Sequence, residues 1–273
     1  MTEATWVHPV EFVDDDEAQA PVWLYELPEK GEDYVLGVDT AEGKIRDRTQ
    51  GPVDVSDRDP DFNAVSVLRV SDGAEVATYL SNYSPPIFIE DVLFLANFYG
   101  PQAGNNPPLI VPECNGIGYA VTTGIRETGY PRIWVRRYWN KLENNWTEEI
   151  GFRTDINTRP MLVRDLQKEV LEGTTGVRCR RTAIHMASMA RNRQGKDEAP
   201  HGAHDDLAFA RMLAIQGWKA LRGDTEPEEN DDEEGIQERI ESSVLRDVEP
   251  SSIVFEDMER EEFERGIHDD LGW

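Results

Sequence analysis

The chain has 273 residues, enough for one full α/β domain or two small ones. It carries 54 acidic and 28 basic residues, a formal net charge of -26, which argues against a protein that coats nucleic acid by overall attraction. No apolar run approaches the roughly 18–20 residues of a membrane-spanning helix, and no secretory signal is readable. Cys114 and Cys179 are too few for a disulfide framework. We therefore expect a cytoplasmic protein.

The charge is distributed unevenly along the chain. Residues 1–62 carry a net charge of -12 and residues 223–273 carry -16, whereas residues 126–222 carry +6. Only 6 of the 28 basic residues are Lys. An acid excess with few lysines is typical of a protein in concentrated salt, and acidic tails are also common in ordinary solvated proteins. The positive middle region stays compatible with a nucleic-acid partner.

The apolar patterns predict a mixed α/β sheet with helices on its faces. A strand over residues 34–38 ends on Asp39, and two alternating runs, 63–70 and 74–80, are joined by the hairpin signal Ser71-Asp72-Gly73. The predicted elements that follow are a helix (87–99), a strand (109–111), a helix (117–128), a strand (132–135) and two helices (158–173 and 203–218). Thr158 is the expected N-terminal cap of its helix, and Gly173 the expected stop.

The same features predict the domain organisation. Residues 1–21 form an extended lead-in, and residues 22–222 form one domain in which 44–60 is an acidic loop insertion. Residues 223–273 form an acidic and largely disordered tail.

Acidic residues adjoin three of the apolar elements. Asp39 ends the first strand, Glu113 follows the buried strand 109–111, and the pair Asp205-Asp206 opens the final helix. Carboxylates that converge there would repel one another unless cations neutralised them, and Mg²⁺ or Mn²⁺ prefers such oxygen ligands. Two such ions about 4 Å apart can hydrolyse a phosphodiester. Any single acid among 54 is more often a solvated surface group, so the placement of these four carries the hypothesis.

The order of these motifs resembles the nuclease domain of a tailed-virus terminase large subunit, over roughly residues 22–218. The run Asp39-Thr-Ala-Glu42-Gly is similar to the first catalytic strand and turn of that family. Asp61-Phe-Asn-Ala-Val fits a further family motif after an insertion, although spacing alone favours Asp47. The second acidic motif is matched by Pro-Glu113-Cys-Asn-Gly-Ile-Gly.

The later motifs of the family are matched as well. Residues 151–166 are similar to the Gly-aromatic-x-Thr segment and the helix after it, and Gly-Ala-His204-Asp205-Asp206-Leu resembles the third acidic motif. His185 stands where family members often carry Glu. His204 is either a group that supports the site or one that orients the helix start.

The resemblance implies a ribonuclease H-like fold with a mixed five-stranded sheet, and cutting of double-stranded concatemeric viral DNA during genome packaging. It places two Mg²⁺ or Mn²⁺ ions on Asp39, Glu113, Asp205 and Asp206, with Glu42, Asp61 and His204 as supporting groups. It implies a packaging ATPase domain or subunit, the small terminase subunit and the portal as partners, in the cytoplasm of an infected host cell. No Gly-x-x-x-x-Gly-Lys-Ser/Thr loop occurs, so we expect no ATPase activity from this chain, which is either an excised domain or one half of a split terminase.

Basic residues gather just ahead of the final helix. We predict that they contact DNA phosphates, although pairing with the abundant acids is the alternative. These residues are Arg178, Arg180, Arg181, Arg191, Arg193 and Lys196. The tryptophans at 134, 139 and 146 are better suited to packing than to base stacking.

Two other functions stay open at this stage. One is another ribonuclease H-like nuclease, such as a junction resolvase or a transposase-like enzyme. The other is a non-catalytic docking module of the packaging motor, in which the acidic tail binds a partner.

Overall fold

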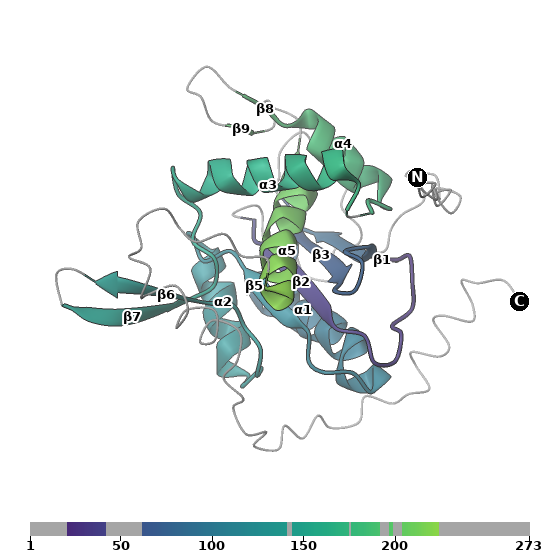
Figure 1. Ribbon diagram of the computed structural model, residues 1–273. Helices are drawn as coiled ribbons and strands as arrows, with labels where there is room; N and C mark the ends of the chain where they lie inside the picture. Colours follow the sequence, from purple (N-terminus) through teal and green to yellow (C-terminus); the bar gives the residue numbers. More distant parts are fainter. Residues whose placement is uncertain are drawn as a thin grey trace, which may run out of the picture.

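A computed structural model describes residues 21–41, 62–140, 144–174, 176–191, 197–198 and 204–223. Its centre is a five-stranded mixed sheet in the order β1-β4-β3-β2-β5 (Figure 1). The strands are β1 (Val22–Leu24), β2 (Tyr34–Asp39), β3 (Asn63–Arg69), β4 (Glu75–Ser81) and β5 (Leu109–Pro112). Neighbouring strands are antiparallel except β2 and β5, which run parallel. The mixed five-stranded sheet flanked by helices that the sequence predicted is confirmed.

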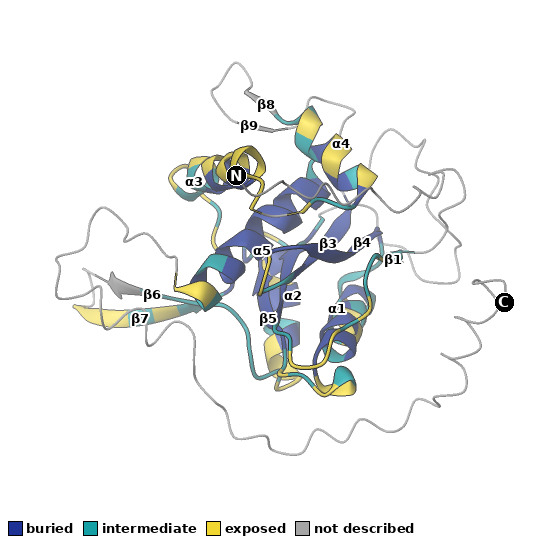
Figure 2. Ribbon diagram, turned by 45° about the vertical axis from the view of Figure 1, so that its right-hand side comes forward, coloured by how far each residue is buried: buried dark blue, intermediate teal, exposed yellow. Residues whose placement is uncertain are grey.

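Helices cover both faces of this sheet. On one face lie α1 (Pro85–Tyr99), which is followed by a 3-10 turn (Pro101–Ala103), and α2 (Gly118–Glu127). On the other face α5 (Asp206–Arg222) crosses β2, β3 and β5, and α3 (Thr158–Glu172) and α4 (Arg180–Ser188) pack on it (Figure 1). Figure 2 shows that α5 is buried along nearly its whole length, as are the central strands. The helix that carries the acidic pair is therefore the core helix of this face.

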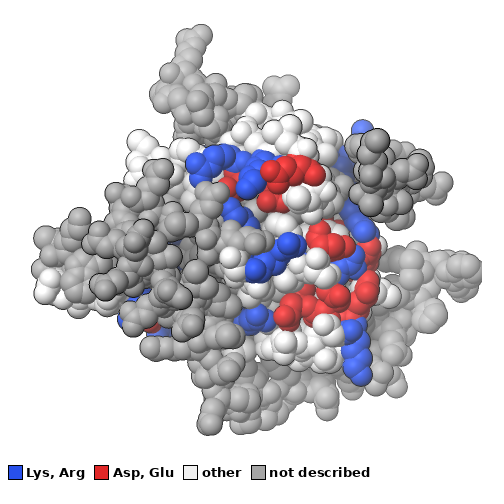
Figure 3. Space-filling model, viewed as in Figure 1, with Lys and Arg blue, Asp and Glu red and all other residues white. Residues whose placement is uncertain are grey.

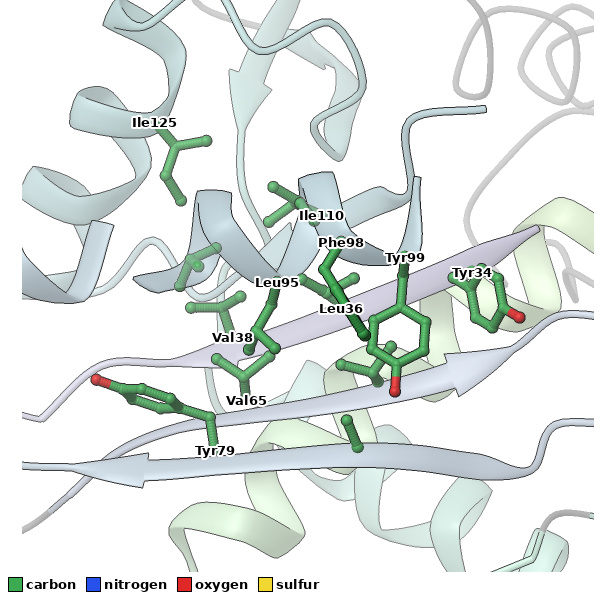
Figure 4. Close-up of a cluster of buried hydrophobic side chains, with 14 of the residues drawn as sticks. Tyr34, Leu36, Val38, Val65, Tyr79, Leu95, Phe98, Tyr99, Ile110 and Ile125 are labelled. Atoms are coloured by element: carbon green, nitrogen blue, oxygen red, sulfur yellow. The ribbon is translucent and has the colours of Figure 1, made fainter. Parts of the chain in front are cut away.

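Alternation along β2 sends its side chains to both faces. Leu36 and Val38 pack with Leu95 and Tyr99 of α1, as Figure 4 shows, whereas Val35 packs with the residues of α5. Since successive side chains of a strand point to opposite faces, Gly37 and Asp39 lie on the α5 side.

Close packing at Gly37 brings α5 onto the sheet. A Cβ atom at this position would lie 2.0 Å from the carbonyl oxygen of Ala210 and 2.3 Å from the backbone nitrogen of Ala214. Only a glycine lets the backbones of β2 and α5 come this close. The start of α5 is thereby held near the end of β2.

Two corrections concern the strands. The predicted strand 132–135 is not part of the sheet: Ile133 makes only an isolated bridge with Ile110. Val135 instead begins β6 (Val135–Asn140), which pairs with β7 (Asn145–Ile150) in a separate hairpin that projects from the sheet (Figure 1). The fifth strand is β1, whose three residues are too few to show an alternating pattern.

The helix boundaries also differ from the predictions. The final helix begins at Asp206, three residues later than expected, and ends at Arg222. Thr158 does not cap α3, because the carboxylate of Asp155 accepts the N–H groups of Asn157 and Thr158 instead. The expected stop at Gly173 is confirmed by its left-handed φ of 64°. Neither α4 nor the β6–β7 hairpin was predicted, and two-residue strands, β8 (Ala190–Arg191) and β9 (Asp197–Glu198), follow α4.

Several predicted segments lie outside the described residues: nearly all of the lead-in, the insertion 44–60 and the tail beyond Gly223. Among the residues that the structure describes, no helix is long and apolar enough to cross a membrane.

Candidate active site

Two parallel strands bring Asp39 and Glu113 together. Asp39 is the last residue of β2, and Glu113 follows β5, where its N–H donates to the carbonyl oxygen of Val38 at 2.9 Å. The two carboxyl groups are close enough for the charge of Glu113 to act on that of Asp39. Because the carboxyl ends of adjacent parallel strands meet at one sheet edge, two acids 74 positions apart form one unit. Their predicted proximity is present in the structure.

The start of α5 adds the acidic pair to this edge. Asp205 is the residue that precedes α5, and Asp206 begins it. Asp206 is buried, and its Oδ1 accepts the N–H of Phe62 at 3.1 Å. Its Oδ2 has no hydrogen-bond partner and lies 3.5 Å from Nδ1 of His204. The predicted position of His204 beside the acidic pair is thus present as well.

The four carboxylates influence one another electrostatically. Burial raises the pKa of Asp39 well above its ordinary value, and the charges of Glu113, Asp206 and Asp205 raise it further. Burial also raises the pKa of Glu113 and that of Asp206. Like charges enclosed together favour the protonated form, so this edge of the sheet holds more negative charge than the protein itself compensates.

Two polar residues orient the carboxylates, and the sequence did not reveal either role. Nη2 of Arg159, in the first turn of α3, lies 3.3 Å from Oδ2 of Asp205, and its guanidinium stands 4.8 Å over the ring of Phe209. Nδ2 of Asn115 donates to Oε1 of Glu113 at 3.3 Å and to the carbonyl oxygen of Thr154. The one sequence signal for Arg159 was a cation at the start of a helix that follows the Gly-aromatic-x-Thr segment.

His185 of α4 supports the start of α5 through a hydrogen bond. Its Nδ1 accepts the N–H of Leu207 at 3.2 Å, and its ring lies 6.0 Å from that of His204. Burial lowers the pKa of His185 to about 4, with the neighbouring His204 as a second cause. A neutral imidazole therefore accepts one of the N–H groups that a helix start leaves without a backbone partner.

The residue types at this edge suit a hard divalent cation. Carboxylate oxygens are the ligands that Mg²⁺ and Mn²⁺ prefer, and the unpartnered Oδ2 of Asp206 is such an acceptor. Within the described ranges, however, no group of three or more His, Cys, Asp or Glu side chains is gathered so that it could hold an ion. Asp205, one of the four acids, is already paired with Arg159. The ligand set of Asp39, Glu113, Asp205 and Asp206 stays a prediction.

Not every predicted site residue is described. Glu42, Asp61 and Asp47 lie outside the described residues, as do Arg193, Lys196 and the side chain of Arg191. Arg178 forms an ion pair with Glu26, and the guanidinium of Arg181 stands 4.2 Å over the ring of Trp23. These two arginines have partners within the protein. Contact of the cluster with DNA stays a prediction.

Charges alternate on the face seen in Figure 1. Figure 3 shows Lys and Arg side chains directly beside Asp and Glu side chains over α3 and α5 on this face. The mixture agrees with the sequence distribution, in which the middle region is less acidic than the two ends. On the part of this face that the structure describes, acidic and basic side chains are both present.

The comparisons with known proteins identify the fold. No protein-family model and no curated protein sequence matches this chain. Among solved structures, the large terminase nuclease of thermophilic phage G20c matches over 73% of this chain and 90% of that chain, at 16% identity and a TM-score of 0.50. The same nuclease with bound magnesium gives a TM-score of 0.52 at 16% identity, over 73% of this chain and 89% of that one. This chain has the terminase nuclease fold.

A second phage protein supports the same conclusion. The large terminase nuclease domain of Thermus phage P74-26 matches over 74% of this chain and 88% of that chain, at 15% identity and a TM-score of 0.50. The G20c nuclease has also been solved with cobalt bound, and that structure matches at a TM-score of 0.52, 15% identity and 73% and 89% coverage. The resemblance that the sequence motifs suggested is confirmed in the fold.

Proposed function

We propose that this chain is a metal-dependent endonuclease that cuts double-stranded viral DNA during genome packaging. The observation that carries the proposal is the meeting of Asp39, Glu113, Asp205 and Asp206 at one sheet edge, where burial and then the charges of the other three acids raise the pKa of Asp39. An uncompensated charge inside a protein lowers its stability. The presence of four acids at this edge therefore indicates a function. The terminase nuclease fold, found in phage proteins solved with magnesium and cobalt, supports this proposal.

The four acids would hold two divalent ions, Mg²⁺ or Mn²⁺, which when bound lower the pKa of a water and stabilise the leaving oxygen of a phosphodiester. Asn115 keeps the carboxylate of Glu113 directed to the site. Arg159 holds Asp205 until the site is loaded. His204 lies against Asp206 on its buried side. The variants Asp205→Asn and Asp206→Asn decide which of the two acids binds an ion directly.

The wider organisation is proposed on the same basis. Residues 22–222 form the nuclease domain, and residues 223–273 form an acidic tail. The ATPase domain or subunit, the small terminase subunit and the portal are the proposed partners. Arg178, Arg180, Arg181, Arg191, Arg193 and Lys196 are proposed DNA contacts, and Glu42 and Asp61 proposed supporting acids. ATP hydrolysis is assigned to another domain or subunit.

Plasmid cleavage in Mn²⁺ tests the proposal. We expect Asp39→Asn, Glu113→Gln and Asp206→Asn each to lower the rate by about 10³-fold, because removing one electrostatic element of an active site typically costs this much. Asp205→Asn distinguishes the two members of the acidic pair. The matched control is Glu127→Gln, an exposed acid on α2 that should cut normally.

The substrate separates the proposal from its alternatives. Full cleavage by Asp39→Asn would refute the site. Faster cleavage of four-way junctions than of linear duplex would favour a resolvase. The absence of any metal-dependent cleavage by the wild-type chain would favour a docking module.

A further inference from the structure

A pocket lies near the carboxylate edge. It has a volume of about 170 Å³ and lies between the segment that enters and leaves the β6–β7 hairpin and the helices α3 and α5. None of the four site acids lines it. Four cationic side chains and a single carboxylate, that of Asp165, do; the cations are Arg136, Arg153, Arg164 and Lys219. In a chain of net charge -26, a cavity with this balance is suited to an anion.

Two of these cations are placed to meet a ligand. Arg164 is exposed on α3 and forms no ion pair with any described residue. The side chain of Arg153 is 58% exposed and forms a long ion pair, 3.7 Å, with Glu149. Lys219 differs, because its ammonium group donates to Asp165 at 3.1 Å inside the pocket. The anion would therefore meet Arg153 and Arg164 at the rim.

The wall of the pocket is aromatic and apolar. Trp134 and Phe152 line it with their ring centres 6.1 Å apart, and Met161 of α3 contributes its thioether. Both rings also pack against the core of the α5 face, so the packing role expected for Trp134 is present. A cationic rim over an aromatic wall is the combination by which proteins bind single nucleotides of an unpaired strand.

The backbone connects this pocket to the carboxylate edge. Phe152 forms a bridge with Glu113, and its N–H donates to the carbonyl oxygen of Pro112 at 2.7 Å. Thr158, which also lines the pocket, directly precedes Arg159, the partner of Asp205. A strand that lies across the four acids would therefore pass close to the pocket.

We propose that this pocket binds a nucleotide, with its base against Trp134, Phe152 and Met161 and its phosphate at Arg153 and Arg164. Two sources share this chemistry: an unpaired nucleotide of a DNA strand, and a free nucleoside phosphate. The proposal goes beyond the endonuclease function and does not require it, because binding at the pocket needs no metal ion and no strand cleavage.

Binding of defined strands without divalent metal tests the proposal. The full chain is titrated with labelled oligo(dT) and with an abasic strand of equal length and charge, with dTMP and ATP as competitors. We expect oligo(dT) to bind about five- to tenfold more tightly than the abasic strand, because stacking contributes on the order of 1 kcal/mol per base or more. Competition by dTMP or ATP would identify the free nucleotide as a ligand, and its absence the DNA strand. Equal affinity for oligo(dT) and the abasic strand, without such competition, would overturn the proposal.

Variants test the phosphate contacts and the base contacts of the proposed nucleotide separately. Arg153→Ala/Arg164→Ala should weaken oligo(dT) binding and lower its salt slope by about 0.7 for each phosphate that is no longer neutralised. Met161→Trp, which fills the pocket without changing charge, should remove the preference for bases and leave the salt slope intact. The control, Lys30→Ala/Arg126→Ala, removes two exposed cations elsewhere.

The failures are distinguishable. Equal losses in the control and pocket variants would overturn the nucleotide pocket, while a cleavage defect confined to the acidic variants would leave the endonuclease in place. Cleavage retained by Asp39→Asn, with base-dependent binding intact, would refute only the proposed catalytic site.

Discussion

Two clusters that contain buried acidic side chains contact α5, one around Glu75 and one around Asp39. They differ in how far the protein compensates their negative charge. Glu75 of β4 is fully buried near the middle of α5. Its carboxylate accepts four hydrogen bonds, from the hydroxyls of Ser66 and Thr182 and from the N–H groups of Arg178 and Cys179. Nη1 of Arg211, also fully buried, lies 3.4 Å from it. Near the start of α5, by contrast, Asp39 faces three other carboxylates.

The difference separates a structural acid from functional ones. Glu75 joins β4, the N-terminus of α4 and α5, and the protein itself supplies every donor that its charge requires. The cluster of Asp39, Glu113, Asp205 and Asp206 is only partly compensated, by groups that include Arg159, Asn115, His204 and the N–H of Phe62. Burial alone does not indicate an active site. Burial without sufficient donors does.

The largest expected effect on stability belongs to the compensated acid. Glu75→Gln keeps the shape but leaves Arg211 without a counter-charge, and removing one partner of a buried pair costs about 3–5 kcal/mol. Urea denaturation measures this loss, with Glu127→Gln as the control. Glu75→Gln/Arg211→Met should regain most of it. If the single variant is as stable as the wild type, the distinction between the two clusters fails.

Helix α4 contacts both clusters, through Thr182 at Glu75 and through His185 at the start of α5, and the effect of His185 depends on pH. Its pKa in the folded protein is about 4, below the ordinary value of 6.5. The unfolded chain therefore binds a proton that the folded chain does not, and stability contributed by the neutral ring is lost as the pH falls from about 6.5 through 4. The loss should be on the order of 3 kcal/mol. His185→Gln should flatten this part of the stability profile, and an unchanged slope would contradict the assignment.

The smallest expected effect on stability belongs to Asp39, and here the substitution should stabilise the protein. In the folded protein the pKa of Asp39 is raised, so the folded chain holds a proton that the unfolded chain releases, and stability falls as the pH rises above about 4. Without metal ions, Asp39→Asn should therefore stabilise the protein by about 1 kcal/mol at pH 8, and the gain should disappear at low pH. Thermal unfolding in EDTA measures it. Destabilisation at pH 8 would show that Asp39 is compensated after all.

The sequence was sufficient to predict the site residues that lie at the ends of apolar strands and helices. Asp39 and Glu113 follow runs of buried strand residues, and Asp205-Asp206 opens a long apolar helix, so the pattern placed all four at element ends. The interactions that complete the site were not readable. Arg159 reaches Asp205 across 46 positions, and no local pattern marks such a pair.

The fold shows the same limit. The central strands were predicted from their alternation, whereas β1 is only three residues long. Glu75 occurs in an alternating run, where an acid is ordinarily exposed, and only the packing of α4 and α5 over β4 buries it. The short helix α4 has few apolar positions, and two of its side chains make polar contacts instead, Thr182 to Glu75 and His185 to Leu207. Tertiary packing decides these features, and a single sequence does not contain them in readable form.

The glycine contacts under α5 have a mechanical consequence. At Gly37 the helix rests on the backbone of β2, and at Gly217 an added Cβ would lie 2.7 Å from both Val35 and Val111. The helix thus meets strand backbone at Gly37 and branched side chains of β2 and β5 at Gly217. Because a shift of α5 along the sheet would drive helix atoms into these neighbours, the two contacts oppose sliding of the helix. They thereby also keep Asp206, at the start of α5, at a fixed spacing from the Asp39–Glu113 pair.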